Sequence, residues 1–134
     1  MRKHDNFVSA LTVLEQAPSQ DLSNEFVQGG VIGKFALQFE LSWKLLKELL
    51  AYEGDPVCAS GSPRDIIKKA FQYYDFMNEE LWLGMLRDRN STAHIYDAEG
   101  AQRLVQTIID DYIPEFQAMR DWIAERYGSI LDER

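Results

Sequence analysis

The residues best suited to chemistry gather in one stretch, Arg87–Asp97. This stretch holds Arg87, Arg89 and His94, and Tyr96 follows the histidine by two positions. An imidazole titrates near neutral pH, and a guanidinium keeps its positive charge at every physiological pH. A proton carrier, two permanent cations and a phenol therefore lie within one short segment. Such a set suits reactions at a phosphate group.

Cleavage of RNA without a metal is the reaction that this set of side chains would support. A histidine can move a proton from the ribose 2′-hydroxyl or to the leaving oxygen. An arginine can bind the phosphate and stabilise the charge that develops on it. The sequence shows no compact group of His, Cys, Asp and Glu ligands, so we predict no metal site and no cofactor. From these residues alone, the alternative for His94 is a hydrogen-bonded, partly buried histidine without a catalytic role.

Helical geometry bears on which arginine would work with the histidine. At about 100° per residue, Arg87 and His94 would lie on nearly the same face of an ideal helix. Asn90 stands four residues before His94 and could orient the imidazole. Arg89 would diverge from His94 by about 140°. A site that uses Arg89 therefore requires a distortion near Ser91–Thr92, or a second subunit, and Arg87 remains its competitor.

Length and charge restrict the function classes. A chain of 134 residues is expected to form one domain with its own core. The net charge of −8 leaves no broad basic surface, so any RNA binding must rest on a local cluster of cations. Cys58 is the single cysteine, which favours a reducing compartment. With neither a signal peptide nor an apolar span expected, we predict a cytoplasmic protein that does not enter a membrane.

The apolar spacing predicts an all-α fold. It is typical of amphipathic helices, and no strand pattern is visible. Short connections favour an antiparallel up-and-down bundle of about five helices. We expect a single domain over residues 1–128 and a frayed tail over residues 129–134. The expected helices cover residues 3–17, 22–52, 62–74, a segment from 78 into the Arg87–Asp97 stretch, and 98–127.

Capping residues indicate where these helices begin and end. Ser23 or Asp21 is expected to cap the long second helix, and Gly54 to end it. The predicted N-caps of the later helices are Ser62, Asn78 and Asp97, and the predicted end of the last helix is Gly128.

Two features inside the helices call for a structural reason. Gly29, Gly30 and Gly33 lie within the long helix, where each glycine costs about 1 kcal/mol relative to alanine. They predict a close approach of another helix or a kink. Pro114 lies inside the last helix and predicts a kink after about Asp110.

Three separated parts of the chain, residues 35–44, 62–64 and 85–96, resemble one family. Within the last part, residues 89–96, Arg-Asn-Ser-Thr-Ala-His-Ile-Tyr, match the R-x4-H-x-Y motif of HEPN-domain proteins. The stretches Phe35–Lys44, Ser62–Arg64 and Met85–Asn90 are similar to the HepT-like branch, also labelled nucleotidyltransferase substrate-binding protein. The resemblance spans roughly residues 5–127, nearly the whole chain.

This resemblance implies a fold, an activity and partners. HepT-like proteins are helical bundles that form homodimers, with the Arg and His of each subunit facing one another across the two-fold axis. They act as ribonuclease toxins of type VII toxin–antitoxin pairs. The antitoxin is a minimal nucleotidyltransferase (MNT), which silences the toxin by transferring AMP to the motif tyrosine.

The residue roles follow by position in the motif. Arg89 would bind and polarise the phosphate, His94 would be the acid and base, and Asn90 would orient His94. Tyr96 would accept AMP, and the added negative charge and bulk would block RNA from a cationic cleft. Arg87 is a further candidate for phosphate contact.

A rival interpretation assigns no catalysis to the chain. It would be a subunit that binds a nucleotide or presents its tyrosine to the nucleotidyltransferase, and the net charge of −8 favours this reading. A third possibility is a helical scaffold with a vestigial motif. We expect packing and surface charge, rather than a site role, for Glu40 and Trp43–Lys44. Arg64, Lys68 and Lys69 would form either a basic strip facing RNA or an ordinary solvated face.

Overall fold

The structure is a computed structural model that describes residues 2–59, 61–91 and 97–131. These residues form helices and contain no strand, which confirms the all-α prediction. The main helices are α1 (Arg2–Leu14), α2 (Glu25–Tyr52), α3 (Pro63–Tyr73), α4 (Glu79–Asn90), α5 (Ala98–Thr107) and α6 (Ile113–Leu131). Short turns are η1 (Ala17–Ser19), η2 (Pro56–Ala59) and the π-helical η4 (Ile108–Tyr112).

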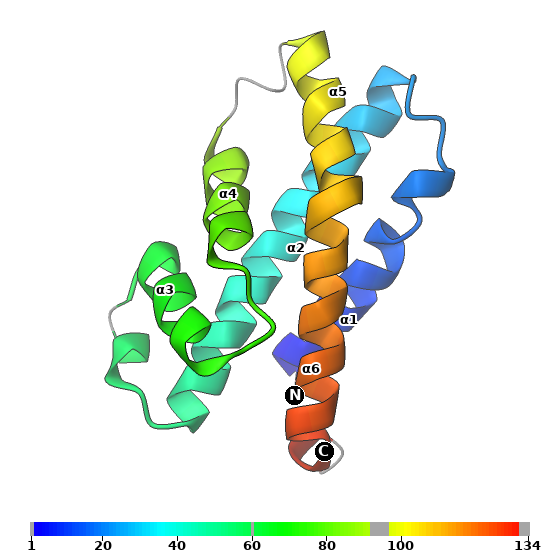
Figure 1. Ribbon diagram of the computed structural model, residues 1–134. Helices are drawn as coiled ribbons and strands as arrows, with labels where there is room; N and C mark the ends of the chain where they lie inside the picture. The colour runs from blue at the N-terminus through cyan, green and yellow to red at the C-terminus, as the bar shows by residue number, and fades with distance from the viewer. Residues whose placement is uncertain (1, 60, 92–96, 132–134) are drawn as a thin grey trace.

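The helices run up and down around α2, as predicted for a bundle. α1 and α4 point toward one end of the molecule, and α2 and the continuous rod of α5, η4 and α6 point toward the other (Figure 1). α2 contacts α1, α3, α4 and α5, so it is the central helix. Aromatic rings fill the space between it and its neighbours: Phe35 stacks on Tyr112, and Phe39 packs against Trp82.

The predicted start of α2 was wrong. The N-cap is Asn24, whose Oδ1 accepts hydrogen bonds from the backbone N–H groups of Phe26 at 2.8 Å and Val27 at 3.2 Å. Asp21 instead accepts from the backbone and hydroxyl of Ser23. Asp21, Ser23 and Asn24 are all favourable N-cap residues. Asp21 and Ser23 hydrogen-bond to each other in the turn before α2, and Asn24 is the residue that caps the helix.

The other caps agree with the sequence. Ser62 forms a capping box with Asp65, and Asn78 and Asp97 accept backbone hydrogen bonds at the starts of α4 and α5. α2 ends as predicted at Gly54, which has φ of +84°. The Gly54 N–H donates to the Ala51 carbonyl at 3.0 Å and the Asp55 N–H to the Leu50 carbonyl at 2.9 Å, a Schellman ending.

Pro114 changes the hydrogen-bond pattern of the last helix. The chain forms the π-helical turn η4, in which the Ile113 N–H donates to the Ile108 carbonyl. A proline supplies no N–H and crowds the carbonyl four residues earlier, and one wider turn relieves both problems. The helix therefore continues past Pro114 with a π-helical turn where the sequence predicted a kink.

The end of the last helix also differs from the prediction. α6 passes through Gly128 and continues to Leu131, and both Tyr127 and Leu131 are buried. Burial of these side chains outweighs the weak helix propensity of one glycine. The first residues of the expected tail 129–134 are thus helical, and residues 132–134 lie outside the described part of the chain.

The glycines of α2 were also interpreted wrongly. A Cβ atom added at Gly29, Gly30 or Gly33 would meet no described atom within 4 Å, so no close helix crossing requires them. α2 is continuous from Glu25 to Tyr52. These glycines instead leave one side of the helix bare of side chains. Gly29 and Gly33 face one pocket and Gly30 a second one.

Candidate functional site

The predicted site residues Arg87, Arg89 and Asn90 occupy the last turn of α4. The helix ends at Asn90, and Ser91 is extended, with φ of −90° and ψ of 119°. The ideal-helix spacing between Arg87 and His94 therefore cannot be carried across Ser91. His94 and Tyr96 lie outside the described residues, so their roles stay predictions.

Arg89 links α4 to the central helix. Its guanidinium donates to the carboxylate of Glu40 on α2 and, at 3.0 Å, to the side-chain oxygen of Asn90. The Arg89 side chain is 31% exposed, so it is partly accessible to solvent. Because it bonds to two groups from two helices, its position is fixed by the fold of the bundle.

Glu40 has a larger role than the packing expected from the sequence. Besides Arg89, its carboxylate accepts a hydrogen bond from the indole N–H of Trp43 at 3.1 Å and lies 3.5 Å from Nζ of Lys44. Two cations, Arg89 and Lys44, share the carboxylate of Glu40, so these three side chains together carry a net positive charge. Glu40 and Arg89 are far apart in sequence, and no spacing rule brings them together. The only signal was that both stretches match the HepT-like pattern.

Arg87 differs from Arg89 in its exposure to solvent and in the residue with which it forms an ion pair. It is 75% exposed, and its ion pair is with its neighbour Asp88 at 3.4 Å. Asp88 itself accepts a hydrogen bond from the hydroxyl of Tyr112 on η4, which ties α4 to the last helical rod. Burial, together with this bond, raises the pKa of Tyr112, so the phenol stays protonated as the donor. The structure thus fixes Arg89 and leaves Arg87 to solvent.

Asn90 contacts the arginine within the described residues. Its side-chain oxygen accepts from Arg89, an arrangement that orients the guanidinium. Its predicted contact with His94 concerns a residue outside the described chain and stays a prediction.

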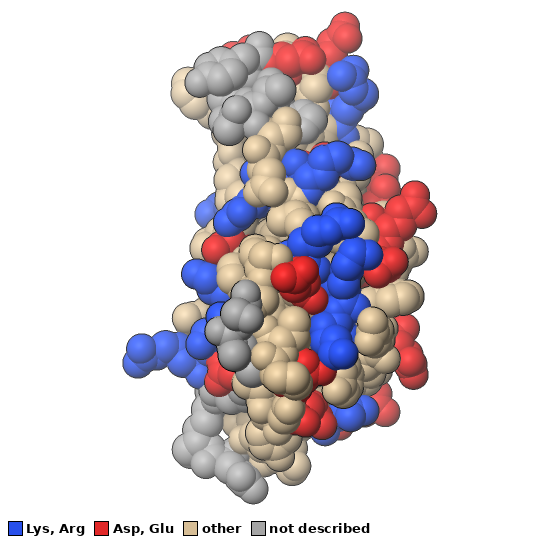
Figure 2. All heavy atoms as spheres, turned by 90° about the vertical axis from the view of Figure 1, so that its left-hand side faces the viewer, with Lys and Arg blue, Asp and Glu red and all other residues tan. Residues whose placement is uncertain are grey.

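The surface around α3 and α4 carries a local concentration of cations despite the acidic chain. Figure 2 shows Lys and Arg side chains in a broken column on this face, with Asp and Glu beside them. Lys68 pairs with Glu79 at 3.7 Å and Lys69 with Asp55 at 3.6 Å. These two lysines are thus compensated, which favours the ordinary solvated face over a basic strip at this place.

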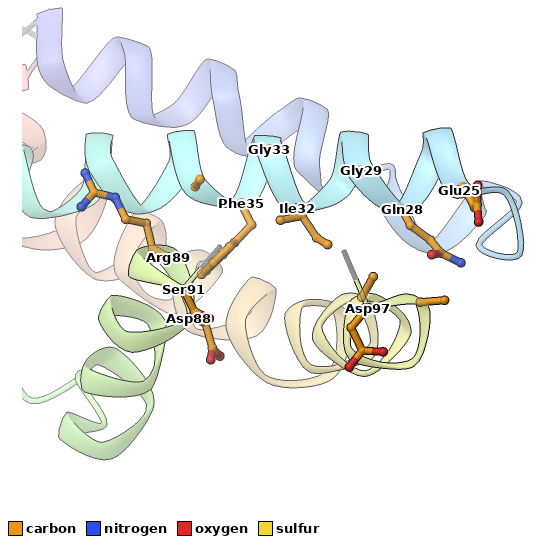
Figure 3. A pocket seen from close by; sticks show the side chains of 13 residues that line it. Glu25, Gln28, Gly29, Ile32, Gly33, Phe35, Asp88, Arg89, Ser91 and Asp97 are labelled. Carbon is orange, nitrogen blue, oxygen red and sulfur yellow. The ribbon is translucent and has the colours of Figure 1, made fainter. Parts of the chain in front are cut away.

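A pocket of about 520 Å³ adjoins Arg89. It lies between α2, from Glu25 to Ala36, and the junction of α4 and α5 (Figure 3). Arg89 stands at one end, and Glu25 and Gln28 at the other. Ile32 and Phe35 form an apolar wall. The volume falls within the range of about 300–1,000 Å³ that is usual for small-molecule sites.

The described residues contain no group of three or more His, Cys, Asp or Glu side chains placed to hold a metal ion. Over the same residues, no helix is both long and apolar enough to cross a membrane.

Comparison with known proteins places this geometry in a family. Residues 2–125 match the family described as "Nucleotidyltransferase substrate binding protein like". A relative from Haemophilus influenzae, "Probable ribonuclease HepT", is 32% identical over 100 residues, which cover 72% of this chain and 67% of the relative. With its helical bundle and its Arg89–Tyr96 motif, the chain belongs to this HepT-like family of nucleotidyltransferase substrate-binding proteins.

Proposed function

We propose that this protein is a homodimeric, metal-independent endoribonuclease and the toxin of a type VII MNT/HEPN toxin–antitoxin pair. The observation that carries the proposal is the fixed position of Arg89, held by Glu40 and Asn90 immediately before the His94–Tyr96 segment. The name of the Haemophilus influenzae relative, a probable ribonuclease, supports the same activity.

The proposed reaction uses the ribose itself as the nucleophile. His94 removes the proton from a 2′-hydroxyl, and the 2′-oxygen attacks the neighbouring phosphorus. The bond from phosphorus to the 5′-oxygen breaks, and that oxygen receives a proton from the imidazolium of a second His94. The products are a 2′,3′-cyclic phosphate and a 5′-hydroxyl. Arg89 balances the charge that builds on the phosphate oxygens.

A homodimer would supply the two histidines that this scheme needs. In a two-fold dimer each subunit brings the same Arg89 and His94 to the axis, so one histidine can act as base and the other as acid. It would also bring two Arg89 guanidinium groups to one phosphate. The family resemblance supports this arrangement.

Control of the activity would act at Tyr96. The cognate nucleotidyltransferase would direct the tyrosine oxygen to the α-phosphorus of ATP, with release of pyrophosphate. The adenylate adds a negative charge two residues from His94. It would repel the RNA backbone and cover the site.

Cleavage assays on purified protein test the nuclease. We expect wild type to cut RNA in the presence of EDTA, and His94→Ala and Arg89→Ala to lose at least about a hundredfold in rate. Arg103→Ala is the matched control, since Arg103 is exposed and its ion pair within the described residues is with Glu99 along α5. Arg87→Ala decides between the two arginines: a loss as large as that of Arg89→Ala would contradict the assignment of Arg89.

The non-catalytic alternative predicts a different pattern, and the acidic net charge is the observation in its favour. Wild type and His94→Ala would both leave RNA intact, while the nucleotidyltransferase with ATP would still modify Tyr96. Mass spectrometry of the peptide that contains Tyr96 measures that step. Tyr96→Phe removes the proposed acceptor of AMP. Its control is Tyr52→Phe, which removes an exposed tyrosine of α2. An unmodified Tyr96 beside an active partner enzyme would end the AMP-transfer proposal.

A further inference from the structure

A basic groove follows α2 from Leu41 to Ala51, on the side that faces the start of α1. It consists of two hollows of about 350 and 480 Å³, which share Lys3, Lys44 and Glu48 and therefore adjoin. We call these two hollows the α1–α2 groove. The charged residues in its described lining are four cations and one carboxylate: Arg2, Lys3, Lys44, Lys47 and Glu48. The groove is thus locally positive on a chain whose net charge is −8.

The pocket between α2 and α5 has the opposite balance of charge. Its charged residues, among the described lining, are three acids and one arginine: Glu25, Asp88, Asp97 and Arg89. Figure 3 shows the Arg89 side chain directed away from this pocket and along α2, where its guanidinium meets Glu40. An anionic ligand that contacts Arg89 is therefore directed toward the α1–α2 groove.

One carboxylate connects Arg89 to the groove. Oε2 of Glu40 accepts from the Arg89 guanidinium, and Oε1 of Glu40 lies 3.5 Å from Nζ of Lys44. Lys44 lines both hollows, and Lys47 follows it on α2 by about one helical turn. At 1.5 Å per residue, Glu40 and Lys47 are about 10 Å apart along the helix axis. A row of cations thus extends from the proposed reaction site along α2.

The groove keeps more uncompensated charge than the lysines of α3, each of which has a carboxylate of its own. Lys3 pairs with Glu48 at 3.4 Å, but Lys44 shares its carboxylate with Arg89. Lys47 forms no ion pair with any residue that the structure describes. Positive charge is therefore left over for a polyanion to neutralise.

An aromatic ring forms part of the same surface. Trp43 lines the larger hollow beside Lys44 and Lys47, is partly exposed, and packs against the core. Its indole N–H donates to Glu40 at 3.1 Å, which fixes the edge of the ring. Proteins that bind single-stranded nucleic acid combine cations that follow the phosphates with rings on which bases stack. The groove offers both within two turns of one helix.

We propose that the α1–α2 groove binds single-stranded RNA next to the scissile phosphate, with phosphates on Lys44 and Lys47 and a base stacked on Trp43. The proposal rests on the proposed ribonuclease function and identifies its substrate as single-stranded. A duplex keeps its bases paired and stacked on one another, so it has no free base for Trp43. Binding should depend little on base sequence, because every base has a face that can stack.

Two lysines of one helix test the phosphate contacts. Lys47→Gln removes a charge inside the groove, whereas Lys34→Gln makes the same change on an exposed side chain of α2 at the second pocket. Each variant changes the net charge from −8 to −9, so a difference between them is a local effect. Neither lysine is buried, so both variants are expected to fold, and thermal melting curves check this.

Binding of fluorescein-labelled single-stranded RNA is measured in the His94→Ala background, so the readout does not depend on cleavage. Each phosphate contact with a single strand contributes about 0.7 to the slope of log K against log salt concentration. We expect Lys47→Gln to lower this slope by about 0.7 and to weaken binding about threefold or more at low salt. Lys34→Gln should change neither quantity. Oligomers of uracil and of adenine should respond alike.

Tryptophan fluorescence tests the stacked base in the same background. A base on the Trp43 ring should quench its emission, and Trp43→Phe should remove most of the quenching while it keeps a ring in place. Trp82 is fully buried and should not respond. Double-stranded RNA is the control ligand and should quench less. Quenching that survives Trp43→Phe would mean that no base stacks at this position.

Two results would overturn the groove proposal. One is a Lys47→Gln protein with the RNA affinity and salt slope of the Lys34→Gln protein, even if the nuclease is active. The other is a Lys47→Gln protein that loses binding of the cognate nucleotidyltransferase but not of RNA, since the groove would then be a protein interface. Wild type that binds RNA with the expected effects of these variants but never cleaves it would refute the nuclease and leave the groove supported.

Discussion

The two halves of α2 show opposite uses of one helix. In its C-terminal half Leu45, Leu46, Leu49 and Leu50 are fully or almost fully buried under the neighbouring helices. In its N-terminal half Phe26 is 92% exposed, and Gly29, Gly30 and Gly33 face open space. Glu40, which holds Arg89, lies between the two halves. The C-terminal half stabilises the fold through buried apolar side chains. The N-terminal half contains glycines, which lower helix propensity, and its surface stays open.

This division explains how a helix tolerates three glycines. Helical stability in proteins comes mainly from packing of the apolar face, and the C-terminal half supplies that packing. Val31 and Phe35 continue the buried side through the glycine region, so the helix stays continuous there. The exposed side of the same turns is then free to contact a ligand.

The largest effect expected from this comparison is on the free energy of unfolding. Leu46→Ala removes a fully buried side chain and should destabilise the protein by about 2–5 kcal/mol. Leu37→Ala is the matched control on the same helix, because Leu37 is 52% exposed, and should change stability by no more than about 0.5 kcal/mol. Urea denaturation measures both. Equal losses would mean that Leu37 is covered in solution, for instance by a second subunit.

The same contrast explains which features the sequence could predict. Apolar periodicity marked the buried stripe of α2, and capping chemistry identified Ser62, Asn78 and Asp97 as helix starts. These are local properties, and each is encoded within a few residues. The helix at Gly128 was misjudged because burial of Leu131, a tertiary effect, outweighed a local preference.

The candidate site was predictable only in part. The motif stretch identified Arg89 and Asn90, but Glu40 was assigned to packing because its contact with Arg89 joins two distant helices. Ideal-helix geometry favoured Arg87 over Arg89 as the partner of His94. That comparison assumed one helix running through His94, but α4 ends at Asn90. The glycines were interpreted as a close approach of another helix or a kink. The sequence shows that these positions carry no side chain, but it does not show whether another helix or open space lies next to them.

An intermediate effect, on RNA cleavage, is expected at the boundary between the two halves of α2. Glu40→Gln keeps an acceptor for Arg89 but removes the ion pair, so the guanidinium should lose its fixed position. We expect kcat for RNA cleavage to fall about ten- to a hundredfold. KM should stay level or fall, because one negative charge is lost near the phosphate site. The cost in stability should be below about 1 kcal/mol for this partly exposed pair.

Glu15→Gln is the control for this substitution. Glu15 also pairs with a partly exposed arginine, Arg120 at 3.0 Å, but it joins the end of α1 to α6, away from Arg89, so its kinetics should match wild type. A raised KM with unchanged kcat in Glu40→Gln would show that Glu40 does not position the arginine for the reaction.

The smallest effects distinguish the glycines at the two ends of α2. Gly30→Ala adds a methyl group in open space within a helix, and should stabilise the protein by up to about 1 kcal/mol. Gly54→Ala should destabilise it by about 1 kcal/mol or more, because φ of +84° is strained for alanine and the Schellman ending depends on it. Both differences are measured by urea denaturation at one protein concentration. Destabilisation by Gly30→Ala would mean that another surface covers this side of the helix in solution. The open half of α2 would then be a packed interface, and the contrast between the two halves would disappear.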